Sequence, residues 1–192
     1  MRLVVAVTGA SGSIYAKNFL EAAKSQGIET HLIVTEAGKT VAGHELGKTE
    51  KLAELVDFTY EPDDLEAPLA SGSFRVDGMV IVPATMKTVA ALAHGYNANL
   101  VTRAADVHLK ERRPLILVPR ETPLHAVHLE NMARLSRLGA VILPAMPGFY
   151  HNPESIDDLA SFITGKILDQ LGVPNNLYRR WGGPRPPPSA PS

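Results

Sequence analysis

The sequence predicts a single α/β domain built as a three-layer, doubly wound parallel sheet. Short runs of apolar, largely β-branched residues recur along the chain, and segments of helical length separate them. Such runs are typical of parallel strands that are covered on both faces, and their alternation with helices favours a parallel sheet. The chain has 192 residues, which suits one domain with a sizeable core.

The alternation predicts five strands and six helices. The strands are expected at residues 3–7, 30–34, 78–82, 115–118 and 140–143. The helices are expected at residues 12–26, 37–46, 86–95, 99–111, 124–138 and 155–171. Residues 57–75 mix acidic residues with Pro, Gly and Ser, so we expect an irregular segment outside the core. Residues 1–181 form the predicted domain, and 182–192 are expected to be a disordered Pro-rich tail.

Composition excludes several classes of protein. The formal net charge is −1, so no overall field attracts the chain to nucleic acid or to anionic lipid. The chain has no cysteine, which rules out disulfides, thiolate metal ligands and cysteine nucleophiles. The first apolar run is too short for a signal peptide or a membrane span. We therefore expect a cytoplasmic protein.

Polar residues gather where each predicted strand ends. These exits are residues 8–13, 35–38, 83–88, 119–123 and 144–153, and they carry hydroxyls, glycines, prolines and charges. Ligands of open parallel sheets bind at the carboxyl ends of the strands. The sequence therefore predicts a binding site at this edge.

The first exit, TGASGS, is not a dinucleotide fingerprint, because Ser11 and Ile14 stand where G-x-G-x-x-G needs glycine. It also lacks the G-K-[ST] ending of a phosphate-binding P-loop. Backbone N–H groups at a helix start can nevertheless bind a phosphate, although the same pattern is an ordinary N-cap. Thr85, Lys87 and Thr88 repeat the design after the third strand. Two such helix starts fit FMN better than NAD.

Single charged residues are weaker evidence for a binding site than the strand exits. Arg120 and Glu121 end a buried strand, where a charge needs a partner or a ligand. Glu45 and Lys110, taken alone, are interpreted as solvated helix residues. His125 and His128 are three residues apart but lack a third ligand, so we predict no metal site. The motifs G-x-S-x-G and H-E-x-x-H are absent.

Longer motifs carry a family resemblance. They are GASGSIYA, PATMKT, LVTRAADVHLKERRPLILVPRETPLHAVHLENM, GAVILPAMPGFYHNPESIDDL and RRWG. Together they closely resemble the UbiX family of flavin prenyltransferases from about residue 3 to about residue 183. The resemblance implies a Rossmann-type, flavodoxin-like flavoprotein fold and a homododecamer. It also implies metal-independent transfer of a dimethylallyl group from dimethylallyl phosphate to N5 and C6 of reduced FMN. The product, prenylated FMN, would serve a UbiD-type decarboxylase.

The resemblance also assigns site residues. FMN would be bound by Gly9, Ala10, Ser11, Thr35, Thr85, Met86, Lys87, Thr88 and Arg120, with Arg103 contributed by a neighbouring subunit. The prenyl phosphate would be bound by Lys110, Arg120, Tyr150 and Lys166. Glu45 and Glu121 would flank the reacting carbons, and with Lys110 they are the predicted catalytic residues.

The chain departs from the family pattern at three places. Ala84 replaces a frequent Cys, Thr35-Glu36 replaces a common Ser-Lys, and Lys166 stands where relatives often carry Arg. The last change substitutes a point charge for a two-pronged contact and bears on the choice between a monophosphate and a diphosphate donor. Two other functions stay open: an FMN-dependent decarboxylase, and a non-catalytic flavin carrier or decarboxylase subunit.

Overall fold

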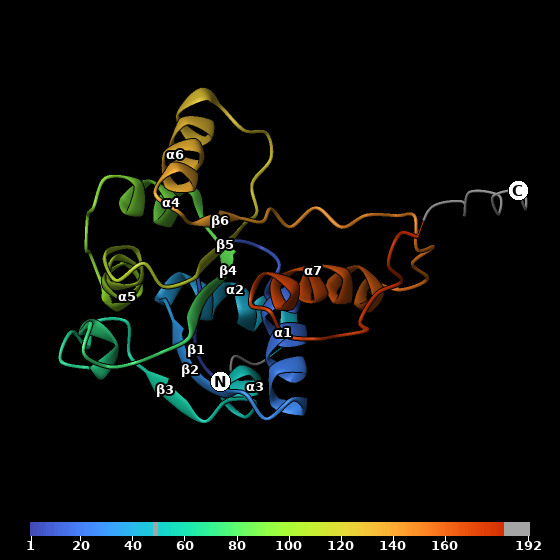
Figure 1. The fold of residues 1–192 in the computed structure, drawn as a ribbon, viewed down its shortest axis with the longest axis horizontal. Helices are drawn as coiled ribbons and strands as arrows, with labels where there is room; N and C mark the ends of the chain where they lie inside the picture. Colours follow the sequence, from blue (N-terminus) through green and yellow to red (C-terminus); the bar gives the residue numbers. More distant parts are fainter. Residues whose placement is uncertain (48–49, 183–192) are drawn as a thin grey trace, which may run out of the picture.

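The fold is a six-stranded parallel sheet with helices on both faces, so the predicted class is confirmed (Figure 1). The computed structural model describes residues 1–47 and 50–182. Residues 183–192 of the predicted tail lie outside the described residues. The strand order is β3-β2-β1-β4-β5-β6. The strands are β1 Arg2–Val7, β2 Glu29–Val34, β3 Phe58–Tyr60, β4 Gly78–Ala84, β5 Leu115–Pro119 and β6 Val141–Ile142.

Helices form the two outer layers. Figure 1 shows one layer made by α1 (Ser13–Ser25), α2 (Glu36–Leu46), α3 (Glu50–Ala53) and α7 (Ile156–Gln170). The other layer is made by α4 (Met86–Ala93), α5 (Leu100–Lys110) and α6 (Ala126–Arg137). Each layer closes its own apolar core: Val5 of β1 packs into the first core, and Val4 and Ala6 pack into the second. This alternation of side chains follows from the pleat of a strand.

The segment expected to be irregular is more ordered than predicted. It contains β3 and a short 3-10 helix at Pro68–Ala70, and Ala67 and Leu69 are buried in the core. The sequence signal is weak because β3 has three residues at the sheet edge and Phe58 is half exposed. The side chain of Arg2 donates to the carbonyl of Arg75, which ties the end of this segment to β1.

The strand order reverses between β1 and β4. The chain proceeds from β1 to β2 and β3 on one side, and from β4 to β5 and β6 on the other. The helices that follow β1 and β4 therefore cover opposite faces, which leaves a crevice at the carboxyl ends of these strands.

Candidate active site

A cavity of about 350 Å³ occupies this crevice. It is lined by the ends of β1, β2 and β4, the starts of α2 and α4, and the cap of α5. Five of its residues were predicted to bind FMN: Gly9, Thr35, Thr85, Lys87 and Thr88. Six others were not predicted: Thr8, Glu36, Ala37, Pro62, Asp63 and Asn99. Thr8 lies in the first strand exit, so its position in the sequence could have identified it as a site residue. Pro62 and Asp63 lie in the segment expected to be irregular, where no such pattern pointed to them.

Threonine hydroxyls fix the helix starts around the cavity. Thr35 caps α2 by accepting a hydrogen bond from the Gly38 amide at 3.1 Å. Thr85 caps α4 in the same way, accepting from the Thr88 amide at 3.2 Å, as its position before a helix predicted. The Thr8 hydroxyl accepts from the Thr85 amide at 2.9 Å. The two caps fix the starts of α2 and α4, and the bond to Thr8 links the loops after β1 and β4.

The two capped helices differ in charge. The first turn of α2 contains the acidic residue Glu36, whereas the first turn of α4 has no acidic residue and contains Lys87. A helix start favours an anion, and a lysine in its first turn adds to the effect. The start of α4 is therefore a better binding site for an anionic group in this cavity than the start of α2.

The start of α1 is already occupied by a carboxylate of the protein. Glu45, at the end of α2, accepts hydrogen bonds from the Gly12 amide at 3.0 Å and the Ser13 amide at 2.7 Å. This corrects the expectation that the first loop leaves a free helix start for a phosphate. Burial acts to raise the pKa of Glu45, but hydrogen bonds from Ser11, Ser13 and Gly12 outweigh it and hold the pKa below its usual value.

Arg120 and Glu121 follow β5 at the same edge. The Arg120 guanidinium donates from Nε to the carbonyl of Ser11 at 3.0 Å. Ser11, Glu45 and Arg120, which are far apart in the sequence, therefore meet beside the start of α1. The Glu121 side chain is exposed and accepts from the amide of Thr122 at 3.1 Å.

Two predicted FMN residues point into the protein instead of the cavity. Ala10 is 5% exposed and Met86 is 7% exposed, and the side chain of Met86, the first residue of α4, packs in the core. Only their backbones are available to a ligand.

The predicted residues of α5 lie away from the cavity within one chain. Arg103 donates to the carbonyl of Ala70 at 3.0 Å and to Asp106 at 3.1 Å. Lys110 pairs with Glu111 at the end of α5. Asn99 caps the opposite end, at the cavity, and eleven residues of helix span about 16 Å. The predicted roles of Arg103 and Lys110 therefore stay predictions that require a second copy of the chain.

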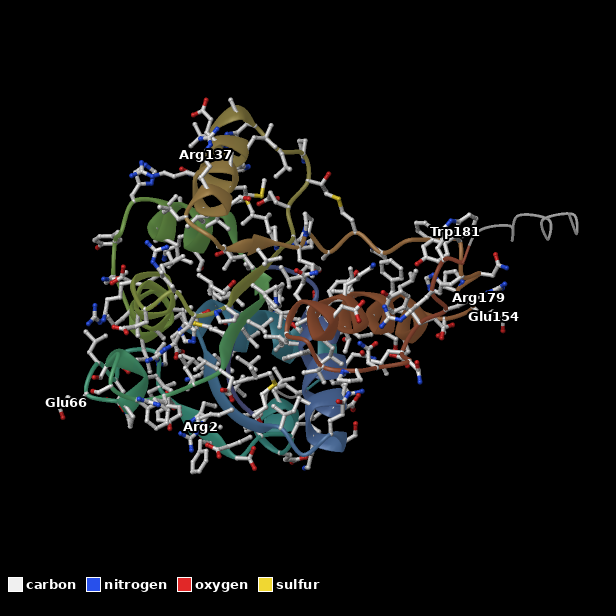
Figure 2. All side chains as sticks on the ribbon, in the orientation of Figure 1. Arg2, Glu66, Arg137, Glu154, Arg179 and Trp181 are labelled. Atoms are coloured by element: carbon white, nitrogen blue, oxygen red, sulfur yellow. The ribbon has the colours of Figure 1, made fainter. Side chains whose placement is uncertain are left out.

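Tyr150 and Lys166 meet in an aromatic cluster beside α7. The ring of Tyr150 lies 5.9 Å from that of Phe162 and 5.6 Å from that of Trp181. The Lys166 ammonium lies 5.7 Å from the Phe162 ring and 5.2 Å from the Tyr178 ring. Figure 2 shows Trp181 at the outer end of the molecule, beyond α7. The structure thus places two of the four predicted phosphate ligands, Tyr150 and Lys166, beside the same ring, that of Phe162.

Asp169 anchors the chain that follows α7. Arg180 donates two hydrogen bonds to its carboxylate, at 2.9 and 2.7 Å, and Tyr178 donates a third at 2.8 Å. The hydrogen bonds from Arg180 are the main cause that lowers the pKa of Asp169 from 3.8 to about 2, against the opposing effect of burial.

This pKa predicts a specific dependence of stability on pH. Because the folded value lies below the unfolded one, the ionised Asp169 stabilises the fold by about 2 kcal/mol above pH 4, and this is lost as pH falls toward 2. Urea unfolding should therefore show that Asp169→Asn is destabilised by a constant amount from pH 7 to about 5. The difference from the natural chain should shrink below about pH 4. A difference that stays constant down to pH 3 would contradict the assignment.

Within residues 1–47 and 50–182, no group of three or more His, Cys, Asp or Glu residues could hold a metal ion. The rings of His125 and His128 lie at the start of α6 with their centroids 3.5 Å apart and are tilted by 31° to each other. No helix in that part of the chain is long and apolar enough to cross a membrane.

Comparison with known proteins gives a family match over most of the chain. The model of the family described as Flavoprotein matches residues 1–168. The chain is 53% identical over 182 residues to the flavin prenyltransferase UbiX of Methanothermobacter thermautotrophicus. That match covers 94% of this chain and 95% of the relative.

Solved structures agree with this match. The dodecameric FMN-dependent UbiX-like decarboxylase from Escherichia coli O157:H7 superposes with a TM-score of 0.93 at 45% identity, covering 95% of this chain and 100% of that one. AnUbiX (PadA1), in complex with FMN and dimethylallyl pyrophosphate, also gives 0.93, at 42% identity, covering 96% of this chain and 98% of that one.

Proposed function

The chain belongs to the UbiX family of flavin prenyltransferases, as its motifs predicted, and from this we propose that it prenylates reduced FMN. The dimethylallyl group moves from dimethylallyl phosphate to N5 and C6 of the flavin. The observation that supports this most directly is the cavity between β1, β2 and β4, with Glu45 and Arg120 at the adjoining edge. We further propose a cytoplasmic homododecamer that delivers prenylated FMN to a UbiD-type decarboxylase.

The cavity suits FMN in its polarity and in the close approach of its backbone. Four threonines, Thr8, Thr35, Thr85 and Thr88, line it together with Lys87. A Cβ at Gly9 would lie 2.5 Å from the Cβ of Ala37, so only glycine lets the first loop pass α2 this closely. We assign the FMN phosphate to the α4 start, because the α1 start holds Glu45 and the α2 start carries Glu36.

Bound reduced FMN supplies the nucleophilic atoms. The chain's own residues act on the donor. Lys166 and Tyr150, with Arg120, would bind the phosphate and stabilise it as the allylic C–O bond breaks. Arg103 and Lys110 would join them from another subunit. Lys and Arg provide here the positive charge that a metal ion supplies in other phosphate chemistry.

Glu45 is suited to stabilise positive charge instead of accepting a proton. Its pKa lies below the usual value, so it stays ionised and is a weak base near neutral pH. Its carboxylate is also held in place by two backbone amides, so it needs no rearrangement when allylic positive charge develops. The proton lost from C6 then goes to Glu121 or to the phosphate product.

An anaerobic incubation tests the function. The purified protein is mixed with reduced FMN and dimethylallyl monophosphate, and the released flavin is analysed by mass spectrometry. We expect the flavin to gain one five-carbon unit. Unmodified FMN with both the monophosphate and the diphosphate would favour a decarboxylase or a flavin carrier.

Lys166→Ala should weaken donor binding and leave FMN binding unchanged. Loss of one charge-assisted contact corresponds to a Kd for dimethylallyl phosphate raised roughly tenfold to a hundredfold. Calorimetry on the FMN-loaded protein measures this. Lys24→Ala is the matched control, because Lys24 lies in the last turn of α1 and donates to the carbonyl of Glu54, which follows α3. Equal donor affinity in both variants would remove Lys166 from the site.

A further inference from the structure

The residues after α7 return to this helix and bind one carboxylate. Asp169 accepts hydrogen bonds from Arg180 and Tyr178, and also from the side-chain amide of Asn175 at 2.9 Å. These four bonds use about the full acceptor capacity of a carboxylate. Arg180 belongs to the RRWG motif, to which neither the sequence nor the proposed reaction assigned a role.

Lys166 lies three residues before Asp169 on α7. Residues at this spacing are neighbours on a helix surface, and opposite charges there normally pair. Within the described part of the chain, Lys166 forms no salt bridge; its ammonium instead lies over the rings of Phe162 and Tyr178. Among the described residues, Lys166 therefore makes no direct ion pair with Asp169, the carboxylate nearest to it in sequence.

Tyr178 lies between the two charges, and its hydroxyl interacts with both Asp169 and Lys166. It is 8% exposed, and its ring packs on Gly165, where a Cβ would lie 2.5 Å from Cδ1 of the ring. Its hydroxyl is held by Asp169. The ring is thus fixed between the carboxylate that it binds and the ammonium that lies over it.

We propose that Arg180 is a positioning residue for the prenyl phosphate: by binding Asp169 on both oxygens, it prevents this carboxylate from pairing with Lys166. Arg180 itself does not touch the donor. The inference rests on the proposed function only in taking Lys166 as a phosphate ligand.

The proposal predicts a rescue that a purely structural role does not. In Arg180→Gln, Asp169 keeps its charge but loses its main partner, and it turns toward Lys166. We expect the Kd for dimethylallyl monophosphate to rise roughly tenfold, the effect of losing one charge-assisted hydrogen bond. Adding Asp169→Asn removes the competing charge. The double variant should return to within about threefold of the natural chain, since Lys166 is free again.

Calorimetry on the full chain loaded with oxidised FMN measures donor binding without turnover. Arg179→Gln is the matched control, because this neighbouring arginine is exposed and lies at the outer surface (Figure 2). FMN affinity, measured in parallel, should be equal in all variants. Unchanged donor affinity in Arg180→Gln, or a double variant that binds no better than the single one, would overturn the proposal. If the natural chain itself bound no dimethylallyl phosphate, the proposed donor site would fail first.

Discussion

Glu45→Gln should slow prenylation about 100-fold and leave the affinity for FMN within about threefold of the natural value. The substitution keeps the size of the side chain but removes its negative charge. In the structure this charge is fixed against the Gly12 and Ser13 amides, beside Ser11 and Arg120. Losing one such preorganised electrostatic group typically reduces the rate of the chemical step by two to three powers of ten, or roughly 3–4 kcal/mol.

Single-turnover kinetics with reduced FMN and saturating donor measure this rate. The neutral amide introduced by Glu45→Gln would also cap α1 less well, which is expected to lower stability by about 1 kcal/mol, so thermal unfolding is followed in parallel. Glu21→Gln is the control, since Glu21 lies on α1 in a surface pair with Lys17. A natural rate in Glu45→Gln, together with lowered stability, would show that Glu45 serves only as a cap.

Local patterns predicted the parts of the site that depend on local physics. Thr85 precedes an apolar helical segment, and it caps α4 as expected. Polar exits after apolar strands must meet at one edge of a parallel sheet, and the cavity is lined by the exits of β1, β2 and β4. By contrast, β3 has no apolar run, because it is a three-residue edge strand.

Roles that depend on distant contacts were not visible in such patterns. Glu45 has the sequence context of a solvated helix residue, and only the packing of α2 against α1 brings it to amides 32 and 33 residues earlier. The resemblance named it, but the residues around it did not. Lys110 was even less predictable from local pattern. In one folded chain it lies at the end of α5 away from the cavity, paired with Glu111. Its predicted role depends on an assembly that the pattern of a single chain does not describe.

Gly38→Ala should lower the free energy of unfolding by about 3 kcal/mol and weaken FMN binding. The added Cβ would lie 2.6 Å from the backbone carbonyl oxygen of Val7 and 3.1 Å from the hydroxyl of Thr35. The Val7 carbonyl also accepts from the Thr35 amide at 3.0 Å, so the start of α2 cannot retreat without breaking that bond. Because Thr35 and Ala37 line the cavity, any retreat also reshapes the FMN site.

Gly72→Ala is the control for Gly38→Ala, because it tests whether the atoms that the new Cβ contacts can move away. A Cβ at Gly72 would meet an equally close atom, Glu111 Oε1 at 2.5 Å, with Lys110 Nζ at 2.8 Å. These are the ends of long side chains, which can rotate away, so Gly72→Ala should cost less than about 1 kcal/mol. Urea unfolding and fluorescence titration with FMN measure both variants. If Gly38→Ala matched Gly72→Ala in stability and in FMN affinity, the contact between α2 and β1 would not control the shape of the cavity.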